Sequence, residues 1–186
     1  MPREADPELP GRILQAADAL WQKGGEDAVT IRGVAAAAKT TTPTVYSYFA
    51  SREALLTALR SVAYERFTAF LKKSKDLDDN CARHLEFAER YGRDYELLFG
   101  HGWLERVTPE TQIAEIDNFA AVLVRAGVAP SRARNAAYPI LMMLHGVIMH
   151  HLSNRKPSGL SRSIKAACLQ ACRILIDREL SMAAKA

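Results

Sequence analysis

The 186-residue sequence lacks the features that define several classes of protein. Its three cysteines cannot all pair within one chain, which excludes a disulfide framework. Its longest apolar run, residues 136–149, contains Pro139, His145 and Gly146 and is shorter than the roughly 20 residues that cross a membrane. The N-terminus has no apolar stretch of the kind that signal peptides carry, so we expect a cytoplasmic protein.

Enzyme motifs and strand patterns are also missing. The sequence has no Gly-x-Ser-x-Gly, no Gly-x-Gly-x-x-Gly, no phosphate-binding loop and no His-Glu-x-x-His. No segment alternates with the period of two that a β-strand needs. A helical chain without such motifs offers no assembled nucleophile, base and oxyanion donor, so we expect no enzyme.

Apolar residues recur with helical spacing throughout the chain and predict an all-α fold of about nine helices. These helices are separated by start signals, such as Thr30 and Ser51, and by stop signals, such as Gly127. The expected helices cover residues 9–24, 31–38, 41–49, 51–70, 84–91, 108–127, 131–153 and 160–181, with a short apolar piece of open form at 97–104. Pro139 should kink its helix or mark the true start of that helix.

Positive charge is concentrated in one short part of the sequence. Residues 30–75 carry eight basic and two acidic residues, although the whole chain has a net charge of only +4. A local excess of this kind is typical of a nucleic-acid contact, and a solvated helix face is the commoner alternative.

Residues 30–49 have the pattern of a helix-turn-helix. Two short helices are joined by a few polar residues, and the second would enter a major groove about 12 Å wide. The hydroxyls of Thr41, Thr42 and Thr44 suit phosphate oxygens, and Arg32 could form two hydrogen bonds with a guanine edge.

Aromatic residues of the second helix allow two interpretations. Tyr46 and Tyr48 could reach the DNA backbone or a thymine methyl, or they could belong to the core of a three-helix bundle. For Val45 and Phe49 the core interpretation is favoured, because both fall on the inward face of the predicted helix.

Residues 12–59, RILQAADALWQKGGEDAVTIRGVAAAAKTTTPTVYSYFASREALLTAL, resemble the N-terminal DNA-binding domain of the TetR/AcrR family of bacterial transcriptional regulators. The matches include the opening IL-x-AA-x-x-L, Thr30-x-Arg32-x-x-Ala35, and Thr44-Val45-Tyr46-x-x-Phe49. One residue departs from the family pattern. Lys39 stands where the turn usually carries a glycine, so the turn avoids a positive φ or Lys39 bears strain, and its charge could contact a phosphate.

The resemblance implies a helix-turn-helix domain over residues 8–52 and a ligand-binding and dimerisation domain over residues 53–182. The expected protein is a repressor that binds a pseudo-palindromic operator as a homodimer and is released by a small apolar or amphipathic effector. The residues expected to contact DNA are Thr30, Arg32, Lys39, Thr41, Thr42, Pro43, Thr44, Tyr46, Tyr48 and Arg52. Among them, Thr30, Tyr46 and Arg52 match positions that contact phosphates in the family.

The C-terminal part supplies the other expected sites. By similarity the last two long helices would pair with those of a partner through apolar faces rich in small residues. The interface residues expected are Ile140, Met143, Val147, Ile164, Ala167, Cys168, Ala171 and Leu175. Apolar walls with a few polar groups suit an effector. The residues expected to line its site are His84, Phe87, Tyr91, Phe99, Trp103, Phe119, Met142 and His145, and ordinary core packing is the alternative for each aromatic residue.

Two other functions stay open. Cys168 and Cys172 are four residues apart, as a metal- or thiol-sensing regulator could require, but no further ligand pattern accompanies them, so we expect no metal or cofactor. The missing turn glycine is the one feature that would suit a helical adaptor that kept the fold without DNA binding.

Overall fold

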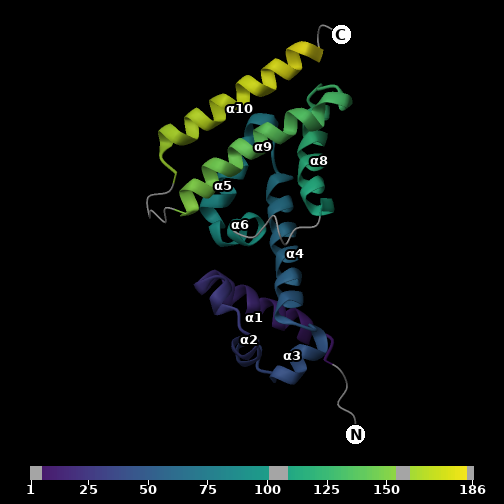
Figure 1. Ribbon diagram of the computed structural model, residues 1–186, viewed down its shortest axis with the longest axis vertical. Coiled ribbons are helices and arrows are strands. Elements are labelled where there is room, and N and C mark those ends of the chain that lie inside the picture. Colours follow the sequence, from purple (N-terminus) through teal and green to yellow (C-terminus); the bar gives the residue numbers. More distant parts are fainter. Residues whose placement is uncertain (1–5, 101–108, 154–159, 184–186) are drawn as a thin grey trace. The chain divides into compact units, whose positions relative to one another are not determined.

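The structure is a computed structural model that describes residues 6–100, 109–153 and 160–183, without the side chains of 109–113. These residues are almost entirely helical and contain no β-strand, which confirms the predicted fold class (Figure 1). The elements are α1 (Leu9–Gly24), the 3₁₀ turn η1 (Glu26–Ala28), α2 (Ile31–Ala37), α3 (Thr42–Tyr48), α4 (Arg52–Leu71), α5 (Leu77–Arg90), α6 (Gly92–Phe99), α8 (Pro109–Arg125), α9 (Pro130–Ser153) and α10 (Arg162–Ala183).

The chain forms two compact units, Met1–Arg66 and Phe67–Ala186. The first unit therefore extends well past residue 52, the expected end of the helix-turn-helix domain. The reason lies in α4, whose Leu55, Leu56 and Leu59 are buried in this unit. Arg66, near the end of the unit, also forms an ion pair with Asp18 of α1 at 2.9 Å.

The N-terminal unit is built from short helices with defined ends. Ile13, Ala17 and Trp21 form the buried face of α1. Gly25 ends this helix with φ of 69°, and its N–H donates to the carbonyl of Trp21 at 2.7 Å. The Ser51 hydroxyl accepts from the backbone N–H of Ala54 at 3.0 Å and so opens α4 as the sequence predicts.

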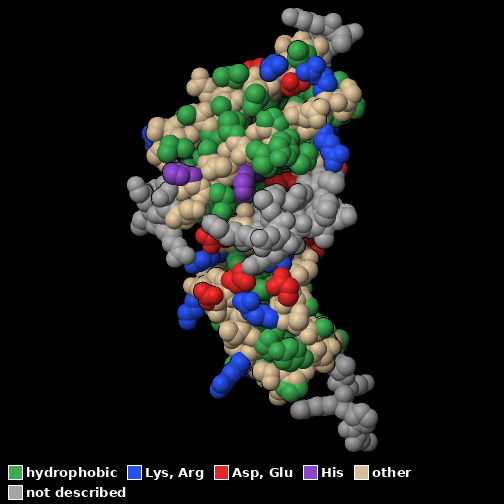
Figure 2. Space-filling model, viewed as in Figure 1, with side chains coloured by type: hydrophobic (Ala, Val, Ile, Leu, Met, Phe, Trp, Pro, Cys, Tyr) green, Lys and Arg blue, Asp and Glu red, His purple; other side chains and the backbone are tan. Residues whose placement is uncertain are grey.

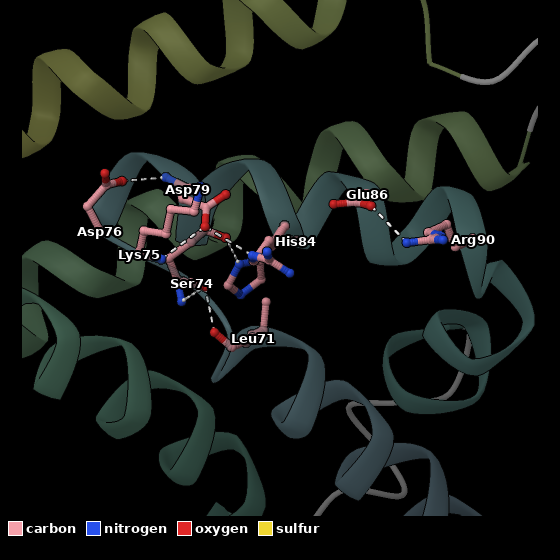
Figure 3. Close-up of polar contacts among 10 residues, drawn as sticks. Leu71, Ser74, Lys75, Asp76, Asp79, His84, Glu86 and Arg90 are labelled. Atoms are coloured by element: carbon pink, nitrogen blue, oxygen red, sulfur yellow. Dashed lines mark hydrogen bonds and ion pairs between the residues drawn. The ribbon is translucent and has the colours of Figure 1, made fainter.

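The C-terminal unit begins with the end of α4 and a capped α5. The Asp76 carboxylate accepts from the backbone N–H of Asp79 at 2.8 Å, so α5 begins at Leu77, earlier than the expected residue 84 (Figure 3). The Ser74 hydroxyl links the two helices, because it donates to the carbonyl of Leu71 and accepts from the Asn80 amide at 3.1 Å.

The remaining helices complete this unit. The sequence did not determine the form of the apolar piece at 97–104. Its residues 97–99 are the last residues of the helix α6, and residues 101–104 lie outside the described part. Gly127, with φ of 107°, ends α8 as predicted. Pro139 lies inside the continuous helix α9 and does not mark its start. Ion pairs of Arg173 with Asp78 and of Lys165 with Glu89 show that α5 and α10 run antiparallel. Among the described residues, no helix is both long and apolar enough to cross a membrane.

Candidate nucleic-acid interface and effector region

The helix α3 has an N-terminus built from threonine hydroxyls. Thr41 caps it, because its hydroxyl accepts from the backbone N–H of Thr44 at 3.3 Å. The two hydroxyls also lie 2.8 Å apart and hydrogen-bond to each other. Pro43 occupies the first turn, where its missing N–H costs no helical hydrogen bond. The backbone of the predicted reading helix is therefore held at the end that would meet DNA.

The preceding helix, α2, has an equivalent cap. The Thr30 hydroxyl accepts from the backbone N–H of Gly33 at 3.0 Å. A Cβ atom on Gly33 would lie only 2.9 Å from that oxygen, so a larger residue would disturb the cap. Sequence reasoning missed Gly33, because nothing in the residue pattern shows how closely the capping hydroxyl approaches it. Arg32, the next residue toward the cap, is exposed and available for contact.

The turn between α2 and α3 adopts a left-handed conformation at Lys39. Its φ of 54° is the only positive value at a residue other than glycine in the described part of the chain. The N–H groups of Lys39 and Thr40 donate to the carbonyls of Ala36 and Ala35, at 3.2 and 2.9 Å. Of the two expectations for this turn, strain at Lys39 is the one observed. Its side chain is exposed.

The side chains of α3 divide into an inner and an outer set. Val45 is fully buried, as predicted, and Phe49 is half-buried. Tyr46 and Tyr48 are 52% and 38% exposed, so the alternative that they form the core of the bundle is wrong. Tyr46, Tyr48 and the exposed Pro43 are therefore accessible to a partner.

Arg52 has an intrachain role that its position in the sequence did not suggest. Its Nε donates to the carbonyl of Val29 at 2.8 Å and its Nη2 to the carbonyl of Glu26 at 2.6 Å. The Glu26 carboxylate lies 3.5 Å from Nη1. These bonds join the start of α4 to the turn η1 and to Val29, so Arg52 stabilises the segments that flank the helix-turn-helix. Its contact with a phosphate stays a prediction.

This arrangement matches known proteins. Residues 13–59 match the family described as bacterial regulatory proteins, tetR family. The N-terminal part of the chain therefore contains a tetR-family domain. No curated protein sequence matches it.

Solved structures share the TetR-like fold over nearly the whole chain. The multidrug binding protein EbrR, complexed with imidazole, is 20% identical with a TM-score of 0.71, over 94% of this chain and 93% of its own. A TetR variant from Acinetobacter baumannii AYE, in complex with minocycline, is 22% identical with a TM-score of 0.66, over 93% and 97%. A TetR-family transcriptional regulator from Streptomyces coelicolor is 22% identical with a TM-score of 0.67, over 93% and 100%.

Most of the expected effector residues that the structure describes lie in an aromatic cluster of the C-terminal unit. The ring of His84 meets Phe67 and Phe119 edge to face, at centroid distances of 5.5 and 5.9 Å. Its Nδ1 lies 2.8 Å from the carbonyl of Asn80 (Figure 3). Burial lowers the pKa of His84 to about 4, so this ring is neutral near pH 7.

A second part of the cluster centres on Tyr95, which sequence reasoning missed. Its hydroxyl lies 3.2 Å from Nδ1 of His145, and its ring lies 4.7 Å from that of Phe99. Phe87 is fully buried and packs against the more exposed Tyr91 at 5.0 Å. Met142 is half-buried, and Trp103 lies outside the described residues. Core packing thus accounts for much of this set.

The predicted interface residues differ in their exposure. Ile140 is fully buried and Cys168 is 5% exposed, so both pack inside their own unit and have no surface left for a partner. Ile164 and Ala167 are exposed, and the other four are half-buried (Met143, Val147, Ala171 and Leu175). Sequence reasoning missed the exposed Tyr138 and Ile174. Hydrophobic side chains gather on the C-terminal unit where α9 and α10 lie (Figure 2).

The cysteines pack together between α5 and α10. All three are buried, and a hydrogen bond with Cys172, together with burial, raises the pKa of Cys81 above its ordinary value. A buried thiol of raised pKa is a poor nucleophile. In the part of the chain that the structure describes, no three His, Cys, Asp or Glu side chains are placed to hold a metal ion.

Proposed function

We propose that this protein is a repressor of the TetR type, which binds a pseudo-palindromic operator as a homodimer and is released by a small effector. The observation that carries the proposal is the helix-turn-helix of the N-terminal unit. A short helix there is capped by Thr41, starts at Thr42 and exposes Tyr46 and Tyr48. The TetR-family fold itself indicates DNA-binding transcriptional regulation.

Base reading is assigned to side chains at the start of α3 and on α2. Arg32, Thr42 and Pro43 would contact base edges, together with Thr44 and Tyr48. Hydroxyl and apolar contacts dominate this set, so the discrimination between base pairs would rest on few strong hydrogen-bonded contacts of a side chain with a base edge.

Phosphate contacts are assigned to the exposed residues around these helices. The Thr30 hydroxyl can donate to a phosphate oxygen, since capping uses its oxygen only as an acceptor from the backbone, and the Tyr46 hydroxyl can donate as well. The Thr41 hydroxyl can donate to a phosphate when Thr44 supplies the proton of the bond between their two hydroxyls. The Lys39 ammonium adds a charge at the turn. Arg52 contributes by holding η1 against α4, and one of the three N–H groups that do not bond to these carbonyls would donate to a phosphate in the bound state.

Effector binding is assigned to the aromatic cluster of the C-terminal unit. It provides apolar walls with two polar points, His84 and the pair formed by Tyr95 and His145. The helix α4 contributes residues to both units, from Arg52 to Phe67 and beyond, and is the proposed path by which the effector changes DNA binding.

Dimerisation is assigned to α9 and α10. The exposed Ile164, Ile174 and Tyr138 lie on these helices, at 45%, 62% and 55% exposure. A surface with several large apolar residues suits a two-fold contact between copies of the chain. Such a dimer would place its reading helices on half-sites about 34 to 36 Å apart, or a multiple of that distance.

A binding titration with the DNA upstream of the protein's own gene tests the proposal. We expect a complex of one or more dimers that survives an excess of random DNA and weakens steeply with salt. Equal affinity for the upstream DNA and for random DNA of the same length would contradict operator recognition. A helical adaptor without DNA binding would give no complex with either.

A further inference from the structure

One acidic side chain of the C-terminal unit faces the aromatic cluster. Glu115 lies on α8 one turn before Phe119, and residues four apart share a helix face. Phe119 is 3% exposed and meets the buried His84. Glu115 is therefore on the inner face of α8, and it is half-buried.

Among the residues that the structure describes, none supplies a counterion to the Glu115 carboxylate. No hydrogen bond or ion pair joins it to any other residue that the structure describes, whereas Asp117, two residues further along, pairs with Arg134 at 2.9 Å. Burial raises the pKa of Glu115 to about 7. A carboxylate withdrawn from water needs a cation or a proton for balance, and no described cation lies within ion-pair distance of Glu115.

The described group that the electrostatics place near Glu115 is the aromatic Tyr95, which packs with two further rings. The charge of Glu115 is close enough to add to the effect of burial in raising the pKa of Tyr95. The rings of Tyr95 and His145 lie 5.9 Å apart, and that of Phe99 lies 4.7 Å from the first and 5.9 Å from the second. Burial lowers the pKa of His145, which keeps that ring neutral. Aromatic faces attract cations and repel anions.

We propose that the effector is an organic cation with apolar substituents, such as a protonated amine, a quaternary ammonium or a phosphonium, and that Glu115 supplies its counterion. The apolar groups would contact Tyr95, Phe99 and Phe119. The inference rests on the proposed function, because it assigns a ligand class to the effector region of the regulator. A neutral or anionic effector would leave the Glu115 charge unbalanced.

The test compares two probes of one shape and opposite charge. Tetraphenylphosphonium and tetraphenylborate are titrated separately into the full chain at pH 8 by calorimetry. We expect the cation to bind at least tenfold more tightly than the anion. Equal binding of the two, tighter binding of the anion, or no binding of the cation would overturn the proposal.

Variants locate the charge. Glu115→Gln keeps the shape and removes the charge, and we expect it to weaken cation binding at least tenfold. Asp117→Asn neutralises an exposed carboxylate on the same helix and should change the affinity less than twofold. Unchanged cation binding by a folded Glu115→Gln protein would refute the assignment. If that variant did not fold, the comparison of the two probes on the unaltered chain would still decide.

Failure of this inference differs from failure of the proposed function. A chain that binds its upstream DNA but ignores the cation is a regulator with another ligand class. If the chain binds the cation through Glu115 but does not bind DNA, the ligand site is supported and the proposed function as a DNA-binding regulator is refuted.

Discussion

Arg52 donates two hydrogen bonds to backbone carbonyls of the N-terminal unit, one of them to Glu26 at 2.6 Å. The other reaches Val29, which immediately precedes the Thr30 cap of α2. One guanidinium thus fixes the start of α4 to the segment that leads into the helix-turn-helix. Because its acceptors are backbone carbonyls, the link does not depend on the identity of the side chains that provide them.

Removing this guanidinium should destabilise the protein. We expect Arg52→Ala to lower the free energy of unfolding by about 1 to 2 kcal/mol, because two charge-assisted hydrogen bonds are lost. Glu26→Gln is the matched control. It keeps both backbone acceptors and removes only a half-exposed ion pair, so its cost should stay below about 0.5 kcal/mol. Urea unfolding measures both, and equal stability of the two variants would contradict the structural role of Arg52.

Substitutions of Lys39 can separate the effect of backbone strain on stability from the effect of the side-chain charge on DNA binding. Lys39→Gly should raise the free energy of unfolding by about 1 kcal/mol, because glycine tolerates the observed φ of 54°. Lys39→Ala keeps the strain and should leave stability nearly unchanged. If the Lys39 ammonium contacts a phosphate, both variants should reduce the slope of the logarithm of the DNA-binding constant against the logarithm of salt concentration by about one unit. A less stable glycine variant would show that the turn is not strained.

The buried imidazole of His84 makes stability depend on pH. Its folded pKa of about 4 lies below the ordinary value of 6.5, so the unfolded chain takes up the proton first. The stabilising contribution is complete above pH 6.5 and is lost as the pH falls toward 4, up to about 3 kcal/mol. His84→Phe should lose less stability than the unaltered chain over this range. Parallel pH profiles of the two proteins, from urea unfolding, would refute a neutral buried His84.

The assembly can be tested at an exposed residue. Ile174 is 62% exposed, so Ile174→Arg should leave each chain folded and place an unpaired charge in the proposed interface. We expect this variant to sediment as a monomer at micromolar concentration and to bind operator DNA weakly. Ala121→Arg, on an exposed position of α8, should stay dimeric. A dimeric Ile174→Arg protein would remove this part of α10 from the interface.

Local features of the fold could be read from the sequence because they depend on local chemistry. Thr30 and Ser51 cap helices, and Gly127 ends one, because each role is fixed by a few neighbouring atoms. The sequence does not determine the conformation of Lys39, since a lysine rarely adopts a positive φ unless the surrounding helices impose it.

Sites that depend on packing could not be predicted in the same way. The helix α9 is apolar on several faces, so periodicity did not separate the buried Ile140 from residues that face outward. Glu115 lies shortly after the polar start of α8, and its sequence context alone suggests a solvent-exposed carboxylate. Only the position of Phe119 on the same helix face shows that Glu115 is turned inward.

The central claim is that α2 and α3 read an operator, and Arg32→Ala tests it most directly. Arg32 is exposed, so its removal should not change the fold. We expect the affinity for the DNA upstream of the gene to fall by at least tenfold, or about 1.4 kcal/mol, with a smaller loss on random DNA, because a contact with a base edge carries sequence information. An equal loss on both DNAs, or no loss on either, would contradict the assignment of this helix pair to operator recognition.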